Sequence, residues 1–139
     1  MNTAPTDSQL EYELQELYIL SEHWLQDISF LEDELRFFNH ILSEYREPGM
    51  SSTVVDFTTK VQEQEKHVNF LKIKIPEFLH FLKPFISDQK KGMDLGFLEK
   101  YNKLETELRL LFAAVKATKK ELFRHTEAIM TTDKTLQTR

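Results

Sequence analysis

One pair of side chains in the sequence has the spacing of a metal-binding motif. Helical bundles bind two metal ions through Glu-x-x-His on each of two helices, completed by a Glu from each of two others. Glu77 and His80 have this spacing in Glu77-Phe78-Leu79-His80, and the motif occurs only once. The periodicity described below places both residues on the solvent side of their helix. We therefore predict no metal site, and no other cofactor.

The remaining residue types argue against catalysis. The chain has no Cys for a Cys–His pair and only 3 Gly, and it contains no Gly-rich phosphate loop or nucleophile elbow. His125 is the only one of the 5 histidines that we expect to be buried. A lone histidine among aromatic residues is more often a packed core residue than a base or ligand, and Glu121 is its expected hydrogen-bond partner. We predict that the protein is not an enzyme and has no small-molecule substrate.

The charges are unevenly distributed along the chain. The formal net charge is −5, yet residues 1–47 contain 11 acidic and only 2 basic residues, so the rest of the chain is mildly basic. We expect an acidic first helix to lie against two basic ones. The best basic stripe contains Lys116, Lys119, Lys120 and Arg124, but it is short and interrupted by acidic neighbours. We therefore predict no binding to nucleic acid.

The elements that would position these residues follow from the apolar periodicity. In three stretches, apolar residues recur at alternating intervals of four and three, the a and d positions of a heptad repeat. We call these positions the apolar seam. The first stretch contains Leu10, Leu14, Leu17, Ser21, Trp24, Ile28, Leu31, Leu35, Phe38, Leu42 and Tyr45. The second contains Val54, Phe57, Val61, Gln64, Val68, Leu71, Ile75, Phe78, Leu82 and Phe85. The third contains Phe97, Tyr101, Leu104, Leu108, Leu111, Val115, Thr118, Leu122, His125 and Ile129.

These seams predict an all-α fold, an elongated three-helix antiparallel bundle with up-down-up, coiled-coil-like topology. We expect helices at about 8–46, 52–90 and 94–130, because short connections force neighbouring helices to run antiparallel. They form a single domain, 8–130, between flexible termini at 1–7 and 131–139. Pro76 and Pro84 would normally end a helix. The second seam passes both without losing phase, so we predict one helix that is kinked at its prolines.

Only four seam positions are polar: Ser21, Gln64, Thr118 and His125. Counted from the two turns, Gln64 and Thr118 fall in the same layer. We predict a buried, hydrogen-bonded polar layer there, which would fix the register of the helices at some cost in stability. The alternative is a ligand site. Ser21 falls level with Pro76, where a small side chain would leave room for the kink.

More apolar residues are present than a three-helix core needs. Outside the seam lie Ile19, Leu20, Phe30, Phe37, Phe70, Ile73, Phe81, Leu110 and Phe123. Either their side chains turn into the core, or they form a contact surface. Our candidate interaction surface contains Ile19, Phe70, Ile73, Phe81 and Leu110, which we expect at one level of the bundle.

The function we expect is therefore protein–protein contact, with a second copy (a dimer) or another protein as the partner. The alternative is peripheral binding to a membrane surface, because Lys72, Lys74, Lys83, Lys90 and Lys91 flank the apolar part of the second helix. No apolar run is long enough to span a bilayer, and residues 1–9 lack the features of a secretory signal. A cytoplasmic location is the default expectation.

Overall fold

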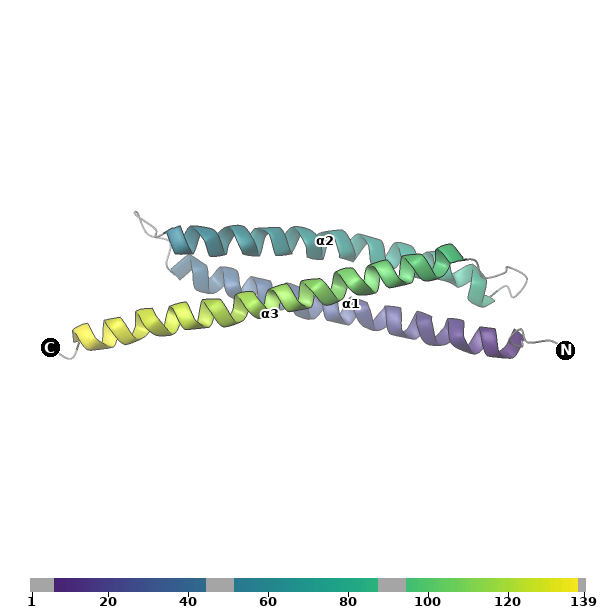
Figure 1. Ribbon diagram of the computed structural model, residues 1–139, viewed down its shortest axis with the longest axis horizontal. Coiled ribbons are helices and arrows are strands. Elements are labelled where there is room, and N and C mark those ends of the chain that lie inside the picture. The colour runs from purple at the N-terminus through teal and green to yellow at the C-terminus, as the bar shows by residue number, and fades with distance from the viewer. Residues whose placement is uncertain (1–6, 45–51, 88–94, 138–139) are drawn as a thin grey trace.

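The computed structural model describes residues 7–44, 52–87 and 95–137, and within these segments the side chains of residues 7–11, 86–87, 95, 97 and 127–137 are not described. These segments are three α-helices: α1 (Asp7–Glu44), α2 (Ser52–Ser87) and α3 (Leu95–Gln137). The helices pack side by side into an elongated bundle in which α1 and α3 run in the same direction and α2 runs against them (Figure 1). The predicted fold class, an up-down-up three-helix bundle, is confirmed.

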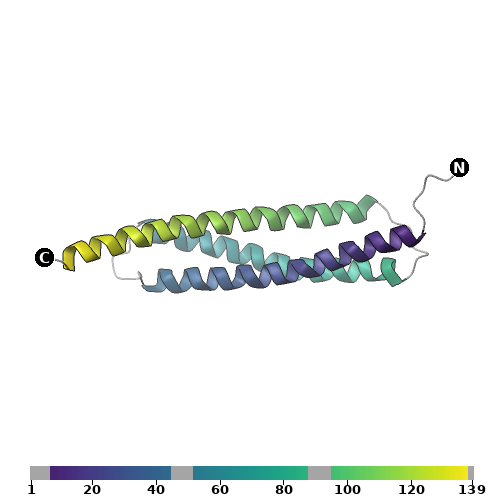
Figure 2. The ribbon, with the colours of Figure 1, turned by 90° about the horizontal axis from the view of Figure 1, so that it is seen from below.

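The helix bounds differ from the prediction chiefly at the C-terminal end. α3 continues to Gln137, so residues 131–137, which we expected to be a flexible tail, are helical. No Gly or Pro follows Gly96, and polar residues alone do not end a helix. The end of α3 extends beyond the other two helices (Figure 2). The predicted ends near residues 46 and 90, and the predicted flexibility of residues 1–6 and 138–139, lie outside the described residues.

The core coincides with the apolar seam. Among the described side chains, every buried residue except Leu79 occupies a seam position. The largest side chains that are completely or almost completely buried are Phe38, Ile28, Leu31, Leu35, Leu42, Leu71, Ile75, Leu82, Leu111, Leu122 and Val61. Because burial of each large apolar side chain contributes about 1.5–3 kcal/mol before entropy is counted, this edge is the main source of stability. The seam positions of all three helices therefore face one another along the bundle axis.

The helices do not contact one another equally. α1 and α2 pack most extensively, α3 packs mainly against α2, and the contact between α1 and α3 is the smallest of the three. α2 is therefore the helix on which the other two rest.

α2 remains a single helix through both prolines. Pro76 is exposed and Pro84 is half-buried, so the missing amide of Pro76 lies toward solvent, where a break in the hydrogen-bond ladder is tolerated. The axis of α2 bends toward its C-terminal end, in the part that contains the prolines (Figure 1). Ser21 is completely buried, and its hydroxyl donates to the carbonyl of Leu17 at 2.8 Å. Its proximity to Pro76 stays a prediction.

We predict that Phe38→Ala lowers the free energy of unfolding by about 3–5 kcal/mol, because it removes a large buried ring and leaves a cavity. The Phe38 side chain is 0% exposed, whereas that of Phe30, on the same helix, is 53% exposed. Phe30→Ala is the matched control and should cost about 1 kcal/mol, since it loses mainly a ring contact. Equilibrium unfolding in urea measures both. Equal losses in the two variants would contradict the position of the core.

Candidate interaction surface

The Glu-x-x-His motif faces solvent. Glu77 and His80 are both exposed, and the Glu77 carboxylate accepts from Lys74 Nζ at 3.4 Å. Within residues whose placement is described, no group of three or more His, Cys, Asp or Glu side chains is arranged to hold a metal ion. The motif is therefore part of an exposed charged surface on α2.

His125 is only half-buried, which corrects the prediction that it is a buried residue. Its ring lies 5.8 Å from that of Phe57, as expected from the seam. Glu121, the partner we expected for it, instead pairs with Lys60 Nζ at 3.1 Å. Phe57 is near the start of α2, so His125 lies at the end of the bundle, where fewer neighbouring side chains cover it.

The predicted polar layer has the expected geometry. Gln64 Nε2 donates to Thr118 Oγ1 at 2.8 Å, and Thr118 Oγ1 donates to the carbonyl of Ala114 at 3.0 Å. Thr118 is buried and Gln64 is half-buried. Gln64 Oε1 is also buried, and it has no hydrogen-bond partner among the side chains that the structure describes. The layer connects α2 to α3 in the middle of the bundle, and its role in fixing the register stays a prediction.

We predict that Thr118→Val costs about 1–3 kcal/mol, because the Gln64 amide then loses its buried partner. Gln64→Leu combined with Thr118→Val should recover most of that loss, since no polar group is then left unpaired. A double-mutant cycle measured by urea unfolding gives both values. Additive losses in the double variant would show that the two side chains are not coupled.

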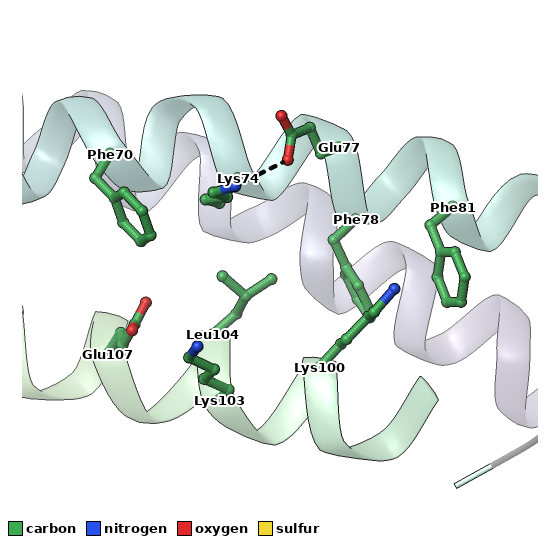
Figure 3. A pocket seen from close by; sticks show the side chains of 9 residues that line it. All are labelled: Phe70, Lys74, Glu77, Phe78, Phe81, Lys100, Lys103, Leu104 and Glu107. Atoms are coloured by element: carbon green, nitrogen blue, oxygen red, sulfur yellow. Dashed lines mark hydrogen bonds and ion pairs between the residues drawn. The ribbon is translucent and has the colours of Figure 1, made fainter. Parts of the chain in front are cut away.

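Two of the exposed apolar residues, Phe70 and Leu110, line grooves between α2 and α3. A groove of about 320 Å³ is lined by Phe70, Lys74, Glu77, Phe78 and Phe81 of α2 and by Lys100, Lys103, Leu104 and Glu107 of α3. Figure 3 shows the three phenylalanines directed from α2 toward α3, with charged side chains around them. Lys100 Nζ lies 3.9 Å from the centre of the Phe81 ring, a cation–π contact. Glu107 Oε2 is buried there and has no hydrogen-bond partner among the described residues.

A second groove continues along the same two helices. It also has a volume of about 320 Å³ and is lined by Lys60, Glu63, Gln64, His67, Leu110, Leu111 and Ala114. Leu110 is 60% exposed and Phe70, beside the first groove, is 44% exposed. We call the residues that line the two grooves the α2–α3 face. Along this face, apolar side chains alternate with charged ones.

The structure separates the five residues of the predicted interaction surface. Phe70, Phe81 and Leu110 line the grooves of the α2–α3 face. Ile19 and Ile73 are exposed, at 54% and 62%, but they line neither groove. Phe81 is partly buried against the core, so it is less available than we expected. The surface is thus a face between two helices. The prediction placed five residues at one level of the bundle, but a shared level does not show whether residues lie on the same side of it.

A different set of aromatic residues closes the boundary between α1 and α3. Phe30 stacks on Phe112 and Phe37 meets Phe123 edge to face, each pair with ring centres 6.3 Å apart. We identified Phe30, Phe37 and Phe123 as surplus apolar residues but missed the pairing. The signal was present in the parallel direction of the two helices, which brings residues about 82–86 positions apart to the same level. Each ring covers part of its partner, but Phe30, Phe37 and Phe123 remain 53%, 46% and 37% exposed.

Ion pairs connect the acidic first helix to the other two. Lys72 Nζ lies 3.1 Å from Glu32, and Lys119 Nζ lies 3.1 Å from Glu34. Both glutamates are on α1, while the lysines are on α2 and α3, as the charge distribution predicted. Such partly exposed pairs contribute about 0–1 kcal/mol each. The α1 carboxylates therefore serve mainly to favour one arrangement of the helices.

Trp24, Phe78 and Tyr101 form an aromatic cluster that joins all three helices. The ring centres of Trp24 and Tyr101 are 5.0 Å apart, and those of Phe78 and Tyr101 are 6.2 Å apart. Burial raises the pKa of the Tyr101 hydroxyl, and the charges of Glu105 and Glu16 raise it further. A tyrosine with a raised pKa holds its proton more tightly in the folded state. Its contribution to stability is present below the pKa of the unfolded chain and is lost as the pH rises through the folded pKa.

We predict that Tyr101 ionises at a higher pH than an ordinary tyrosine. Trp24 is the only tryptophan, and a nearby tyrosinate quenches its fluorescence, so an alkaline titration of that fluorescence reports on Tyr101. The quenching should occur above about pH 10, the ordinary pKa. Tyr101→Phe is the control and should remove it. Quenching with a midpoint at or below the ordinary pKa would contradict the burial of the hydroxyl.

Comparison with known proteins adds no relative. No protein-family model matches the chain, and neither the curated proteins nor the solved structures include a significant match. Among the helices of the described segments, none is long and apolar enough to cross a membrane. Any function must therefore be inferred from the surfaces themselves.

Proposed function

We propose that this protein acts through protein–protein contact rather than catalysis, and that it self-associates through the α2–α3 face. The observation that carries the proposal is the exposed apolar strip formed by Phe70, Leu110 and the grooves beside them. Burial of such a strip stabilises association, since each Å² of apolar surface removed from water contributes about 25 cal/mol. Contiguous apolar patches on a soluble domain typically mark interaction sites.

The charges of the α2–α3 face favour a second copy as the partner. Its grooves contain the lysines Lys60, Lys74, Lys100 and Lys103 and the glutamates Glu63, Glu77 and Glu107, and Glu121 lies against Lys60. Four positive and four negative side chains leave the face close to neutral. A neutral face with both signs can meet another copy of itself without net repulsion. It has little attraction for anionic lipid, which basic surfaces bind.

The boundary between α1 and α3 is less suited to this role. Its exposed rings already pair with one another, as Phe30 does with Phe112. α1 is also strongly acidic, so an α1–α1 contact between two copies would bring like charges together. The α2–α3 face is not strongly acidic, since its positive and negative side chains balance.

We predict that the wild-type chain dimerises with a dissociation constant of about 1–100 µM, which is typical of a small interface. Phe70→Glu should abolish the dimer while helicity is retained, because a buried unpaired carboxylate is costly. Ile19→Glu is the matched control: it places the same charge at an exposed apolar position outside the grooves, and it should leave the dimer intact. Sedimentation equilibrium measures association and circular dichroism measures helicity. A wild-type chain that stays monomeric at high micromolar concentration would overturn the proposal.

A second experiment distinguishes self-association from binding to the other candidate partner, a lipid surface. Co-sedimentation with vesicles of phosphatidylcholine and phosphatidylserine should leave the protein in the supernatant if the α2–α3 face binds another copy. Binding to these vesicles that Phe70→Glu removes would instead assign the face to a membrane surface, and would contradict dimerisation as its function.

A further inference from the structure

On the α2–α3 face, the charged residues of α2 would pair with opposite charges on a second α2 that runs in the reverse direction. Along this side of α2, at the c and g heptad positions, the order is Lys60, Glu63, His67, Phe70, Lys74, Glu77 and Phe81. Read backwards from Glu77, a second α2 places Glu77 opposite Lys60 and Lys74 opposite Glu63. His67 then lies opposite Phe70. All three pairs share one centre, between residues 68 and 69.

α3 has a similar centre of its own. At the same heptad positions of α3 the order is Lys100, Lys103, Glu107, Leu110, Ala114, Ala117, Glu121 and Arg124, of which the last three continue beyond the residues that line the grooves. Read backwards about residue 112, Lys103 falls opposite Glu121 and Leu110 falls opposite Ala114. Ala114 and Ala117 are exposed, and their small side chains allow a close approach of a second helix. Lys100 falls opposite Arg124, but this like-charged pair is at the solvent-exposed end of the face, where repulsion is screened.

The two centres lie at the same level of the folded chain. α2 and α3 are antiparallel, and the contacts Lys60–Glu121 and Gln64–Thr118 place the point between residues 68 and 69 level with residues 112 to 114, within about two residues of the α3 centre. A single twofold axis can therefore run through both centres. Such an axis, perpendicular to the helices and in the plane of the contact, pairs α2 with α2 and α3 with α3 in antiparallel fashion.

On this basis, which rests on the proposed self-association, we infer that two copies pack face to face about that axis as an antiparallel dimer. Lys60 of each copy pairs with Glu77 of the other, Glu63 with Lys74, and Lys103 with Glu121. Phe70, Leu110 and Ala114 form the apolar centre, away from water. The interface contains charges of both signs around an apolar middle, which is the usual arrangement of an association surface.

The size of this face fits a weak, reversible dimer. Residues 60–81 of α2 extend over about 33 Å at 1.5 Å per residue. Two helices side by side are about 18 Å wide, because packed helix axes are 8–10 Å apart. The contact would cover about 600 Å² per copy, near the lower limit for a specific complex. The charge pairs would then determine the direction of the partner more than the strength of binding.

Charge reversal tests the pairing. Lys74→Glu should raise the dissociation constant on the order of tenfold, because it sets two carboxylates against each other at both symmetric sites. Glu63→Lys should do the same. The double variant Glu63→Lys with Lys74→Glu restores opposite charges across the axis, and its dissociation constant should return to within about threefold of wild type.

Lys66→Glu is the matched control for these variants. Lys66 is exposed on α2 but lines neither groove, so the same change of charge there should leave dimerisation unchanged. Analytical ultracentrifugation gives the dissociation constants, and circular dichroism confirms that each variant is folded. A double variant that binds no better than the single ones would overturn the antiparallel pairing.

Distances between spin labels test the direction directly. The chain has no Cys, so Lys66→Cys and His80→Cys each give one labelling site on the outer side of α2. In the antiparallel dimer, the two labels are offset along the helix axis by about 3 Å for each residue from the centre, twice the rise per residue. This axial offset is about 8 Å for position 66 and about 35 Å for position 80, so the measured distance should be longer for position 80.

A parallel dimer would give equal distances at both positions, measured by double electron–electron resonance on the full chain. That result would overturn this arrangement and leave the proposed self-association standing. A wild-type chain that is monomeric in the same samples would overturn both.

Discussion

The fold depends on the burial of one continuous apolar edge along each helix. No single residue holds the bundle together, because the contribution is spread over all the seam positions and the contact is repeated every three or four residues. α2 has the largest share of this contact, since both α1 and α3 pack against it. A helix that was interrupted or out of phase would expose the apolar edges of its neighbours.

This constraint explains why irregular residues are tolerated where they occur. Pro76 falls on the outer side of α2, so the helix bends without turning the apolar edge away from its neighbours. Two polar side chains within the seam find local partners: Ser21 donates to a carbonyl of its own helix, and Gln64 Nε2 donates to Thr118 of the adjacent one, while Gln64 Oε1 has no partner among the described residues. Each polar residue in the seam lowers the stability of the fold, and the surrounding apolar contacts are numerous enough to offset this loss.

The unequal packing of α3 determines the surface of the molecule. Because α3 rests mainly on α2 and has little contact with α1, the two boundaries of α3 differ. Aromatic pairs that are themselves partly exposed line the α1 boundary, while grooves with exposed Phe70 and Leu110 lie at the α2 boundary. An apolar strip of this kind costs free energy in water. That cost is the physical reason to associate function with contact rather than with chemistry at a single site.

The sequence by itself determined the three helices, their direction, the core and the Gln64–Thr118 layer. A heptad repeat specifies which edge of a helix is buried, and short connections specify how adjacent helices run. The prediction from the sequence was wrong at the end of α3, where no residue marks the end of the helix. It was also wrong about the extent to which His125 is buried. The proposed contact surface followed only from the tertiary structure. Ile19, Ile73 and Leu110 all lie outside the core edge in the sequence pattern, yet only Leu110 lines a groove, because exposure beside a groove depends on the angle and distance between two helices. The angle and the distance between two helices depend on how whole side chains pack, and the periodicity of the sequence does not specify that packing.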